Sequence, residues 1–520
     1  MIEADVHAQL RLFLRSSAEI TWPHHLTLAR LVARALRLHR GCFLQISGSA
    51  VFQRRYQLSY LLPLLLFPEP VILVAPEEVH PQLLHHDIPR LLTFLDGTKP
   101  VQTGDRWPQD SFKGLFLVSQ DHWLQDYINQ RQGFPAGIVT LVDGLEHLEP
   151  ESRQQLTQTI DTQAWESLKL AYPMALDLIR DFRARLAHRL FQRPINPDQR
   201  YLLTDDERSL LQHLGGQLQS TRHPLPSPWD SFFHLLDHDE SVTWGQVDPQ
   251  QGHISLHAAP IPLAPTLEPL WQRQPTVFIG GTIEATAQAP LFHQRLGLPT
   301  MTTVKFAPDR HTEAIQFYLA EHLPLPNTPE FQPALQRALS ELLSHVSHLE
   351  GPAVILVEDM PLRDQLGTVL AAEFGSRVQI ERLAIAPASH IQASSPTILT
   401  PTILICRTSF WIRHARQIPC PALLALATLP IPSPEDPLVA AQIEFHKQQK
   451  QDWFRQYLLP ECLNRLERAI APVRQGGTLV ALFDSRVTRR SYGKDILTIF
   501  SPYERISEQY LKEHLHLSFC

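Results

Sequence analysis

This chain of 520 residues has no lysine before Lys99, no closely spaced pair of cysteines, no long apolar run and no net positive charge. The first lysine is Lys99, so no lysine is available to a nucleotide-binding loop before it. No apolar run approaches the roughly 20 residues of a membrane-spanning helix. The net charge is −7, so contact with nucleic acid would need a local basic surface. The five cysteines lack the spacing of a zinc site, an iron–sulfur cluster or a disulfide framework; they are Cys42, Cys406, Cys420, Cys462 and Cys520.

The remaining composition is ordinary for a large globular protein. Hydrophobic residues make up 43% of the chain and charged residues 19%. The length suggests about two to four domains. Residues 1–15 carry acids and no long apolar core, which is not typical of a signal peptide. We therefore expect a cytoplasmic protein with no membrane partner.

Strand-like and helix-like runs alternate along the chain, which is typical of parallel sheets covered by helices. Apolar runs predict strands at 42–46, 71–75, 114–118, 138–142, 276–279, 353–357, 378–382, 402–406, 422–427 and 478–483. Helices are predicted at 26–38, at 154–192 with a break near Pro173, and at 205–218; Pro- and His-rich connections follow from 223 to 265. The fold class is therefore α/β, with one unit at 1–150 to which 250–296 returns, a helical insertion at 151–249 and a second unit at 297–520.

The segment from Arg40 to Pro76 has the layout of a nucleotide-binding unit. A strand, a loop, an apolar helix and a second strand follow one another there. A phosphate-binding loop needs glycines, so that backbone N–H groups can approach the phosphates, and a lysine that reaches the terminal phosphates. The loop here runs Ser-Gly-Ser-Ala-Val-Phe-Gln-Arg-Arg-Tyr-Gln from Ser47 to Gln57. The strand–loop–helix–strand layout is present, but the glycine-rich sequence and the lysine that would bind phosphate are missing.

Several strings resemble the DinG/XPD-like branch of the superfamily 2 helicases. Residues 429–441 are similar to the family's Leu-Pro-Phe-x-x-Pro-x-Asp-Pro-Leu segment. The order and spacing of the other matches extend the resemblance over nearly the whole chain; they are Trp453, Phe454, Tyr457, Pro460, Asp484, Arg486, Tyr492, Gly493 and the Ser-Phe-Trp string at 409–411. The resemblance implies two RecA-like parallel-sheet domains, with an arch-like helical insertion in the first and a helicase carboxyl-terminal domain from 297.

The family's phosphate loop is degenerate in this chain. Alignment on the Tyr-Leu-Leu-Pro helix places Tyr56 at the lysine position and Gln57 at the position of the magnesium-binding hydroxyl. Bulky residues at 52–55 replace the glycines. Glutamine cannot substitute for a hydroxyl on Mg²⁺. Arg54 and Arg55 remain as candidate phosphate contacts, although arginine is a larger, forked donor than lysine.

The family's Asp-Glu-Ala-His motif is also altered. Asp143 follows a predicted strand and is able to hold a metal-bound water, but Gly144 replaces the glutamate that would act as base. Glu146 lies two positions further on. Two interpretations remain open: Asp143 and Glu146 are turn and capping residues, which we favour, or Glu146 is a displaced base.

The motifs that couple the two domains in the family also differ in this chain. The Thr-Ser-Ala-Thr string is replaced at 279–283, where Thr282 is kept. Arg413 lies in the segment that aligns with the family's fifth motif, where the acidic residues of that motif are absent. In the sixth motif Ala471 replaces the first arginine and Arg474 remains. No cysteine lies between Cys42 and Cys406, so no iron–sulfur cluster is expected.

A predicted helix carries Arg185, Arg189 and Arg193 at spacings that place them on one face. These arginines are candidates to grip a phosphate backbone, or they form an ordinary solvated face. With Thr282 and Arg413 they are the candidate nucleic-acid-binding residues. The vestigial nucleotide-binding positions are Arg54, Arg55, Tyr56, Gln57, Asp143 and Arg474.

The sequence therefore favours a helicase-like protein that binds single-stranded DNA or RNA, or a protein partner, without ATP hydrolysis. No catalytic residue, metal or cofactor is expected. Two alternatives stay open. One is an active ATP-dependent DNA helicase, in which ATP and Mg²⁺ are held by Arg54, Arg55, Asp143 and Arg474. The other is a structural docking subunit. We also expect the strands ending at Ile46 and Val142 to be neighbours in one sheet.

Overall fold

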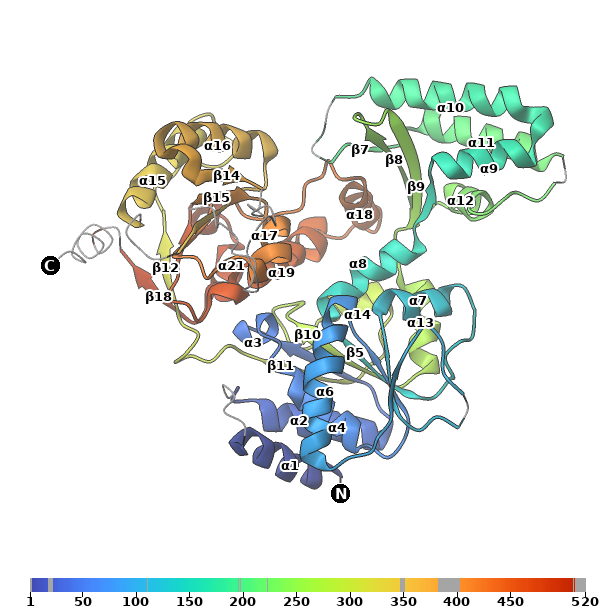
Figure 1. Ribbon diagram of the computed structural model, residues 1–520. Coiled ribbons are helices and arrows are strands. Elements are labelled where there is room, and N and C mark those ends of the chain that lie inside the picture. The colour runs from blue at the N-terminus through green and yellow to red at the C-terminus, as the bar shows by residue number, and fades with distance from the viewer. Residues whose placement is uncertain are drawn as a thin grey trace, which may run out of the picture.

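The structure of the chain is a computed structural model. It describes residues 2–16, 22–109, 111–194, 196, 198–221, 223–346, 351–381, 403–507 and 509. Two α/β units and an insertion form three bodies (Figure 1). No described helix is long and apolar enough to cross a membrane.

The first α/β unit is built on a seven-stranded parallel sheet in the order β11-β1-β10-β5-β2-β4-β3. Its strands are β1 (Cys42–Ile46), β2 (Val71–Val74), β3 (Val101–Thr103), β4 (Leu115–Val118), β5 (Val139–Asp143), β10 (Thr276–Gly281) and β11 (Thr302–Phe306). The inner strands β1, β2, β4, β5 and β10 are buried throughout, as expected for a parallel sheet covered on both faces.

Helices cover both faces of this sheet. Apolar residues of α1, α2, α4 and α6 pack on one face, and those of α7, α8, α13 and α14 pack on the other. The helices of this unit are α1 (Ile2–Ser16), α2 (His25–Leu38), α3 (Ser49–Phe52), α4 (Gln57–Leu66), α5 (His80–Gln82), α6 (Ile88–Leu95), α7 (Gln120–Ile128), α8 (Leu145–Leu156), α13 (Ala264–Arg273) and α14 (Pro290–Leu296).

The second α/β unit repeats this plan, with a parallel sheet in the order β14-β15-β13-β16-β17-β12-β18. Its strands are β12 (Ile315–Leu319), β13 (Ala353–Leu356), β14 (Val378–Ile380), β15 (Ile403–Cys406), β16 (Leu423–Leu426), β17 (Leu479–Leu482) and β18 (Tyr503–Ile506). Its helices are α15 (Phe331–Val346), α16 (Met360–Phe374), α17 (Thr408–His414), α18 (Pro437–Gln448), α19 (Leu459–Ile470), α20 (Arg486–Arg489) and α21 (Gly493–Phe500). The predicted α/β class with two parallel-sheet units is confirmed.

The insertion combines helices with an antiparallel sheet. Helices α9 (Thr162–Ala171), α10 (Leu176–Phe191), α11 (Asp205–Gln219) and α12 (Trp229–Leu236) enclose a core of their own. The four strands lie in the order β6-β9-β8-β7; they are β6 (Gln158–Ile160), β7 (Arg200–Leu202), β8 (Ser241–Asp248) and β9 (His253–Pro260). The prediction of a purely helical insertion was therefore incomplete.

The structure differs from the sequence predictions at several further points. Strands β1 and β5 belong to one sheet but are not neighbours, because β10 lies between them. Strand β6 interrupts the long helix predicted from 154. Strand β9 pairs within the insertion, whereas residues from 250 were assigned to the first unit. Strand β11 pairs with β1, so the first unit extends past the predicted boundary at 297.

Candidate functional site

A cleft of about 2610 Å³ lies among the two α/β units and the insertion. One wall is formed by the end of β5 and by five residues of the phosphate-loop segment 47–57: Val51, Phe52, Arg54, Tyr56 and Gln57. Helices α17 and α19 of the second unit line the facing wall, and β8 and β9 of the insertion border another side. Parallel α/β sheets bind ligands at the carboxyl ends of their strands, and this cleft lies where β5, β13, β15 and β16 end.

Asp143, at the end of β5, lies inside a cage of hydrogen-bond donors. The Tyr56 hydroxyl donates to Oδ1 over 2.6 Å, and the Tyr60 hydroxyl donates to Oδ2 over 2.7 Å. The Gln57 side-chain amide donates to Oδ2 over 3.0 Å, and the Gly144 backbone N–H donates to Oδ1 over 2.9 Å. Asp143 is 1% exposed. The side chains at the lysine and hydroxyl positions therefore occupy the carboxylate that would otherwise hold a metal-bound water.

Burial dominates the electrostatics of this cage. Burial raises the pKa of Asp143, although the hydrogen bonds from the two tyrosines oppose that rise. Burial and the adjacent carboxylate raise the pKa values of Tyr56 and Tyr60 well above the ordinary value for tyrosine. Both hydroxyls therefore keep their protons at neutral pH and remain donors. Among the described residues, no group of three or more His, Cys, Asp or Glu side chains is arranged to hold a metal ion.

Gly144, the residue after Asp143, lies in a crowded turn against Pro76. Gly144 has a φ of +80°, a region that side-chain-bearing residues rarely adopt. A Cβ at this position would lie 2.9 Å from Cγ of Pro76. A glutamate here would have to adopt a strained left-handed conformation and displace the Pro76 ring. The chain path at 144 therefore disfavours any side chain at this position.

Glu146 is directed toward the end of β10. Its Oε2 accepts a hydrogen bond from the Gly281 backbone N–H over 2.7 Å. A Cβ on Gly280 would lie 2.3 Å from the backbone nitrogen of Leu145, so glycine at 280 permits the close approach of α8. The change from Thr-Ser-Ala-Thr to a string with two glycines thus fits the packing of α8. Glu146 accepts this hydrogen bond across the sheet edge and does not cap α8, whose N-cap is Gly144 with no side-chain cap hydrogen bond.

The backbone donors of the former phosphate loop also have internal partners. The Gly48 N–H donates to Oε1 of Glu467 over 3.2 Å, and the Ser49 N–H donates to Oε1 of Glu313 over 2.8 Å. Carboxylates thus lie where a phosphate-binding loop would meet an anionic ligand. With Asp143 caged and no lysine before Lys99, these residues do not fit Mg²⁺-ATP.

The remaining vestigial positions do not converge on one point. Arg54 lies 3.7 Å from Glu78 in an ion pair, and Arg55 donates to the Gln475 side chain. Arg474 is 2% exposed and donates to backbone carbonyls within the second unit and the connection before it, those of Glu313, Ile499, Phe500 and Ser501. Arg474 therefore fixes the fold and does not line the cleft. The set of phosphate contacts that the active-helicase alternative requires is not assembled.

The candidate nucleic-acid-binding residues are divided among three places. Thr282 is buried, where its hydroxyl lies 2.6 Å from that of Ser47 and joins the ends of β1 and β10. Arg185 and Arg189 are exposed on α10, outside the cleft. Arg193 donates to Glu207 and to the Leu202 carbonyl, so it stabilises the insertion. Of the five, only Arg413 lines the cleft.

The structure places Arg413 in a group of cleft arginines, which we define as Arg413, Arg416, Arg465 and Arg468; sequence reasoning missed the last three. Two lie on α17 and the turn after it, and two on α19. The Trp411 indole N–H donates to the Ala469 carbonyl over 2.8 Å and holds these helices together. Burial lowers the pKa of Arg468, although the charges of Glu146 and Glu461 oppose this shift. The two carboxylates therefore do not fully offset the effect of burial on the guanidinium. The only sequence signal was the repeated three-residue spacing, which is common on solvated helices.

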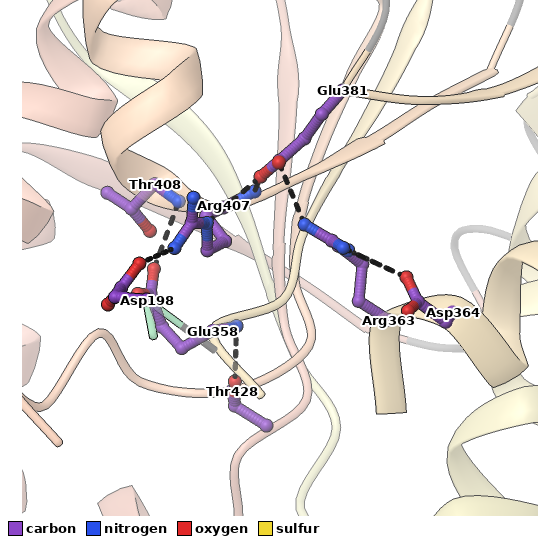
Figure 2. Close-up of polar contacts among 8 residues, drawn as sticks. All are labelled: Asp198, Glu358, Arg363, Asp364, Glu381, Arg407, Thr408 and Thr428. Carbon is purple, nitrogen blue, oxygen red and sulfur yellow. Dashed lines mark hydrogen bonds and ion pairs between the residues drawn. The ribbon is translucent and has the colours of Figure 1, made fainter. Parts of the chain in front are cut away.

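The carboxyl ends of neighbouring strands in the second sheet carry a network of charged and polar residues. Arg407 follows β15 and forms ion pairs with Glu381, which follows β14, and with Asp198 of the insertion, at 3.2 Å and 3.0 Å (Figure 2). Glu358 accepts from the Thr408 backbone N–H over 3.0 Å. The insertion is therefore tied to the second unit at the edge of the cleft.

The comparisons with known proteins agree with this architecture. No family model matches the chain. The ATP-dependent DNA helicase YoaA of Haemophilus influenzae is 25% identical over 227 residues, 42% of this chain and 34% of that protein. YoaA of Escherichia coli is 23% identical over 263 residues, 49% and 40% of the two chains. The match thus spans less than half the length of either relative.

Solved structures share the fold over nearly the whole chain. An XPD helicase superimposes with a TM-score of 0.59 and 12% identity, covering 94% of this chain and 100% of the other. S. tokodaii Xpd4 gives a TM-score of 0.58 and 14% identity with the same coverage. At these identities the likeness is one of fold. The two parallel sheets match the RecA-like domains expected from the sequence.

Proposed function

We propose that this chain, a DinG/XPD-like relative of the superfamily 2 helicases, binds single-stranded nucleic acid in its interdomain cleft without hydrolysing ATP. The observation that carries the proposal is the pairing of a caged Asp143 with a wall of cleft arginines. The first removes the means of hydrolysis. The second supplies cations to a space that a polyanion can enter.

The cleft arginines favour the phosphate backbone as the ligand. Guanidinium groups make forked hydrogen bonds with phosphate oxygens, and several on one wall suit a chain of phosphates. Arg413 is exposed, and Arg465 and Arg468 are half-buried. The net charge of −7 means that this local cation cluster, and not the overall field, must provide the attraction. Such binding tolerates many sequences and weakens steeply with salt.

A titration of a fluorescent single-stranded oligonucleotide at several salt concentrations tests this proposal. If four arginines each neutralise one phosphate, the plot of log affinity against log salt should have a slope of roughly −3. The double variant Arg413→Glu with Arg465→Glu should flatten that slope by about 1.4 and weaken binding at least roughly tenfold at low salt.

The matched control reverses two charges on α10, Arg185→Glu with Arg189→Glu. Both double variants change the net charge equally, so a general electrostatic effect would weaken them alike. We expect the α10 variant to keep most of the affinity and the salt slope. If the α10 pair carries the larger loss, the strand binds on the insertion. If the unaltered protein binds no oligonucleotide at low salt, the docking-subunit alternative replaces this proposal.

A further inference from the structure

We propose that the former phosphate loop is now an interdomain clasp, residues 48–55, that holds the two α/β units closed without a nucleotide. This inference goes beyond nucleic-acid binding and does not depend on it. Within this segment, five residues contact the second unit or the connection leading to it: Gly48, Ser49, Phe52, Gln53 and Arg55.

Two buried carboxylates form the centre of the clasp. Glu313 lies in the connection between β11 and β12, where the chain passes from the first unit to the second. Its Oε1 accepts from the Ser49 backbone N–H and from the Ser49 hydroxyl, and its Oε2 accepts from the Asp309 N–H over 2.9 Å. Glu467, on α19, accepts from the Gly48 N–H. The side chains are 4% and 6% exposed, so water does not compete strongly for these donors.

Glycine at 48 is required by this arrangement. Its φ is +80°, and a Cβ there would lie 2.6 Å from Oε2 of Glu313. Gly48, the one glycine of the loop, therefore lets the carboxylate of Glu313 approach the backbone closely. Hydrogen bonds to charged acceptors are stronger than those between neutral groups, which suits a contact between domains.

Side chains extend the clasp on both sides of this centre. The Phe52 ring packs against the core of the second unit, and Arg416 lies over it at 5.5 Å while donating to the Phe52 carbonyl over 2.8 Å. Gln53 and Arg55 both donate to the side chain of Gln475. The residues that replaced the glycines of the loop thus make its interdomain contacts. Their bulk, which excludes a nucleotide, gives the clasp its contact surface.

A second contact closes the same cleft independently of the loop. Arg295, on α14 of the first unit, pairs with Glu461 on α19 over 3.1 Å and with Glu149 over 3.3 Å. These carboxylates raise the pKa of the Arg295 guanidinium despite its burial, so it stays charged. The loop and this bridge both attach to α19. A change confined to the loop should therefore loosen the clasp without separating the units completely.

Hydrogen–deuterium exchange of the 520-residue chain, without nucleotide or nucleic acid, tests the clasp. The amides of Gly48 and Ser49 should be protected in the unaltered protein. The variant Glu313→Ala with Glu467→Ala should speed exchange of the peptide spanning 47–56 at least roughly tenfold, because both acceptors are removed. A matched control, Glu321→Ala with Glu444→Ala, removes two exposed glutamates of the second unit and should leave this peptide unchanged.

If the double alanine variant fails to fold, Glu313→Gln with Glu467→Gln keeps one carbonyl acceptor at each position and should give an intermediate exchange rate. Small-angle scattering of the same samples should show a larger radius of gyration for the clasp variant. Rapid exchange of the Gly48 and Ser49 amides in the unaltered protein would overturn the proposal. So would equal exchange in the clasp variant and the control, or further protection of the loop by Mg²⁺-ATP. None of these results involves nucleic acid, so the clasp and the proposed binding function fail separately.

Discussion

The purified protein is expected to release no phosphate from ATP above background, with or without single-stranded DNA. Positioning and electrostatic stabilisation supply most of the catalysis of phosphoryl transfer, and several of the groups that provide them are missing or occupied. Tyr56 and Gln57 bind Asp143, Gly144 stands at the position of the base, and Glu313 and Glu467 bind the loop. Loss of these groups together should cost many orders of magnitude.

A phosphate-release assay with the Asp143→Ala variant as the matched control checks this expectation. The two proteins should give the same rate, and Asp143→Asn provides a nearly isosteric control if the alanine variant is unstable. Turnover by the unaltered protein that is lost in Asp143→Ala would contradict the proposed loss of hydrolysis. We also expect the triple variant Tyr56→Lys, Gln57→Ser and Gly144→Glu to remain inactive, because the backbone at 144 and the carboxylates on the loop are unchanged.

The second large effect concerns the stability of the first α/β unit. Changing Tyr56 and Tyr60 to phenylalanine removes two of the four donors around a buried carboxylate and leaves the ring volumes unchanged. Each hydrogen bond to a charged group contributes about 1.5–3 kcal/mol, so the double variant should lose about 3–6 kcal/mol of unfolding free energy. Urea unfolding followed by tryptophan fluorescence measures this loss.

A matched control for that experiment is Tyr172→Phe. The Tyr172 side chain is 4% exposed, but its hydroxyl donates to a neutral acceptor, the His223 carbonyl, over 2.6 Å. Its loss should cost only about 0.5–1.5 kcal/mol. Equal losses in the cage variant and the control would mean that the charge of Asp143 is not what the tyrosines stabilise. The cage would then be ordinary core packing.

Much of the architecture could be predicted because local patterns of apolar residues indicate it. Fully apolar runs such as 71–74 and 423–426 indicate strands buried on both faces, and their alternation with helices indicates parallel sheets. The strands β8 and β9 carried a detectable signal too, because Val242, Trp244, Ile254 and Leu256 alternate with other residues around a turn at Gly252. The prolines and histidines nearby hid that pattern.

Sheet order and the partners of the loop could not be predicted in the same way. Nothing in the local sequence of β1 or β5 states that β10, which follows β5 by more than a hundred residues, lies between them. The missing lysine predicts that the phosphate-loop segment does not bind a nucleotide. The new partners of that loop, Glu313 and Glu467, lie hundreds of residues away and have no motif that marks them. Contacts of this kind are set by the approach of two folded units.

The cleft arginines illustrate the same limit. Arg185, Arg189 and Arg193 drew attention because they lie close together in the sequence and share a helix face. The structure places two of them outside the cleft and pairs the third with Glu207. Arg413, Arg416, Arg465 and Arg468 come from two helices that the sequence does not connect, and only tertiary packing brings them to one wall.

We propose that the groups which would hold a nucleotide are used within the chain, so that the protein binds a single strand independently of ATP. The most direct test is to measure the anisotropy of a fluorescent single-stranded oligonucleotide over a titration of the protein, once with Mg²⁺-ATP and once with an equal ionic strength of magnesium and sodium salts. The account predicts one curve for both conditions. An affinity that changes with Mg²⁺-ATP would contradict it.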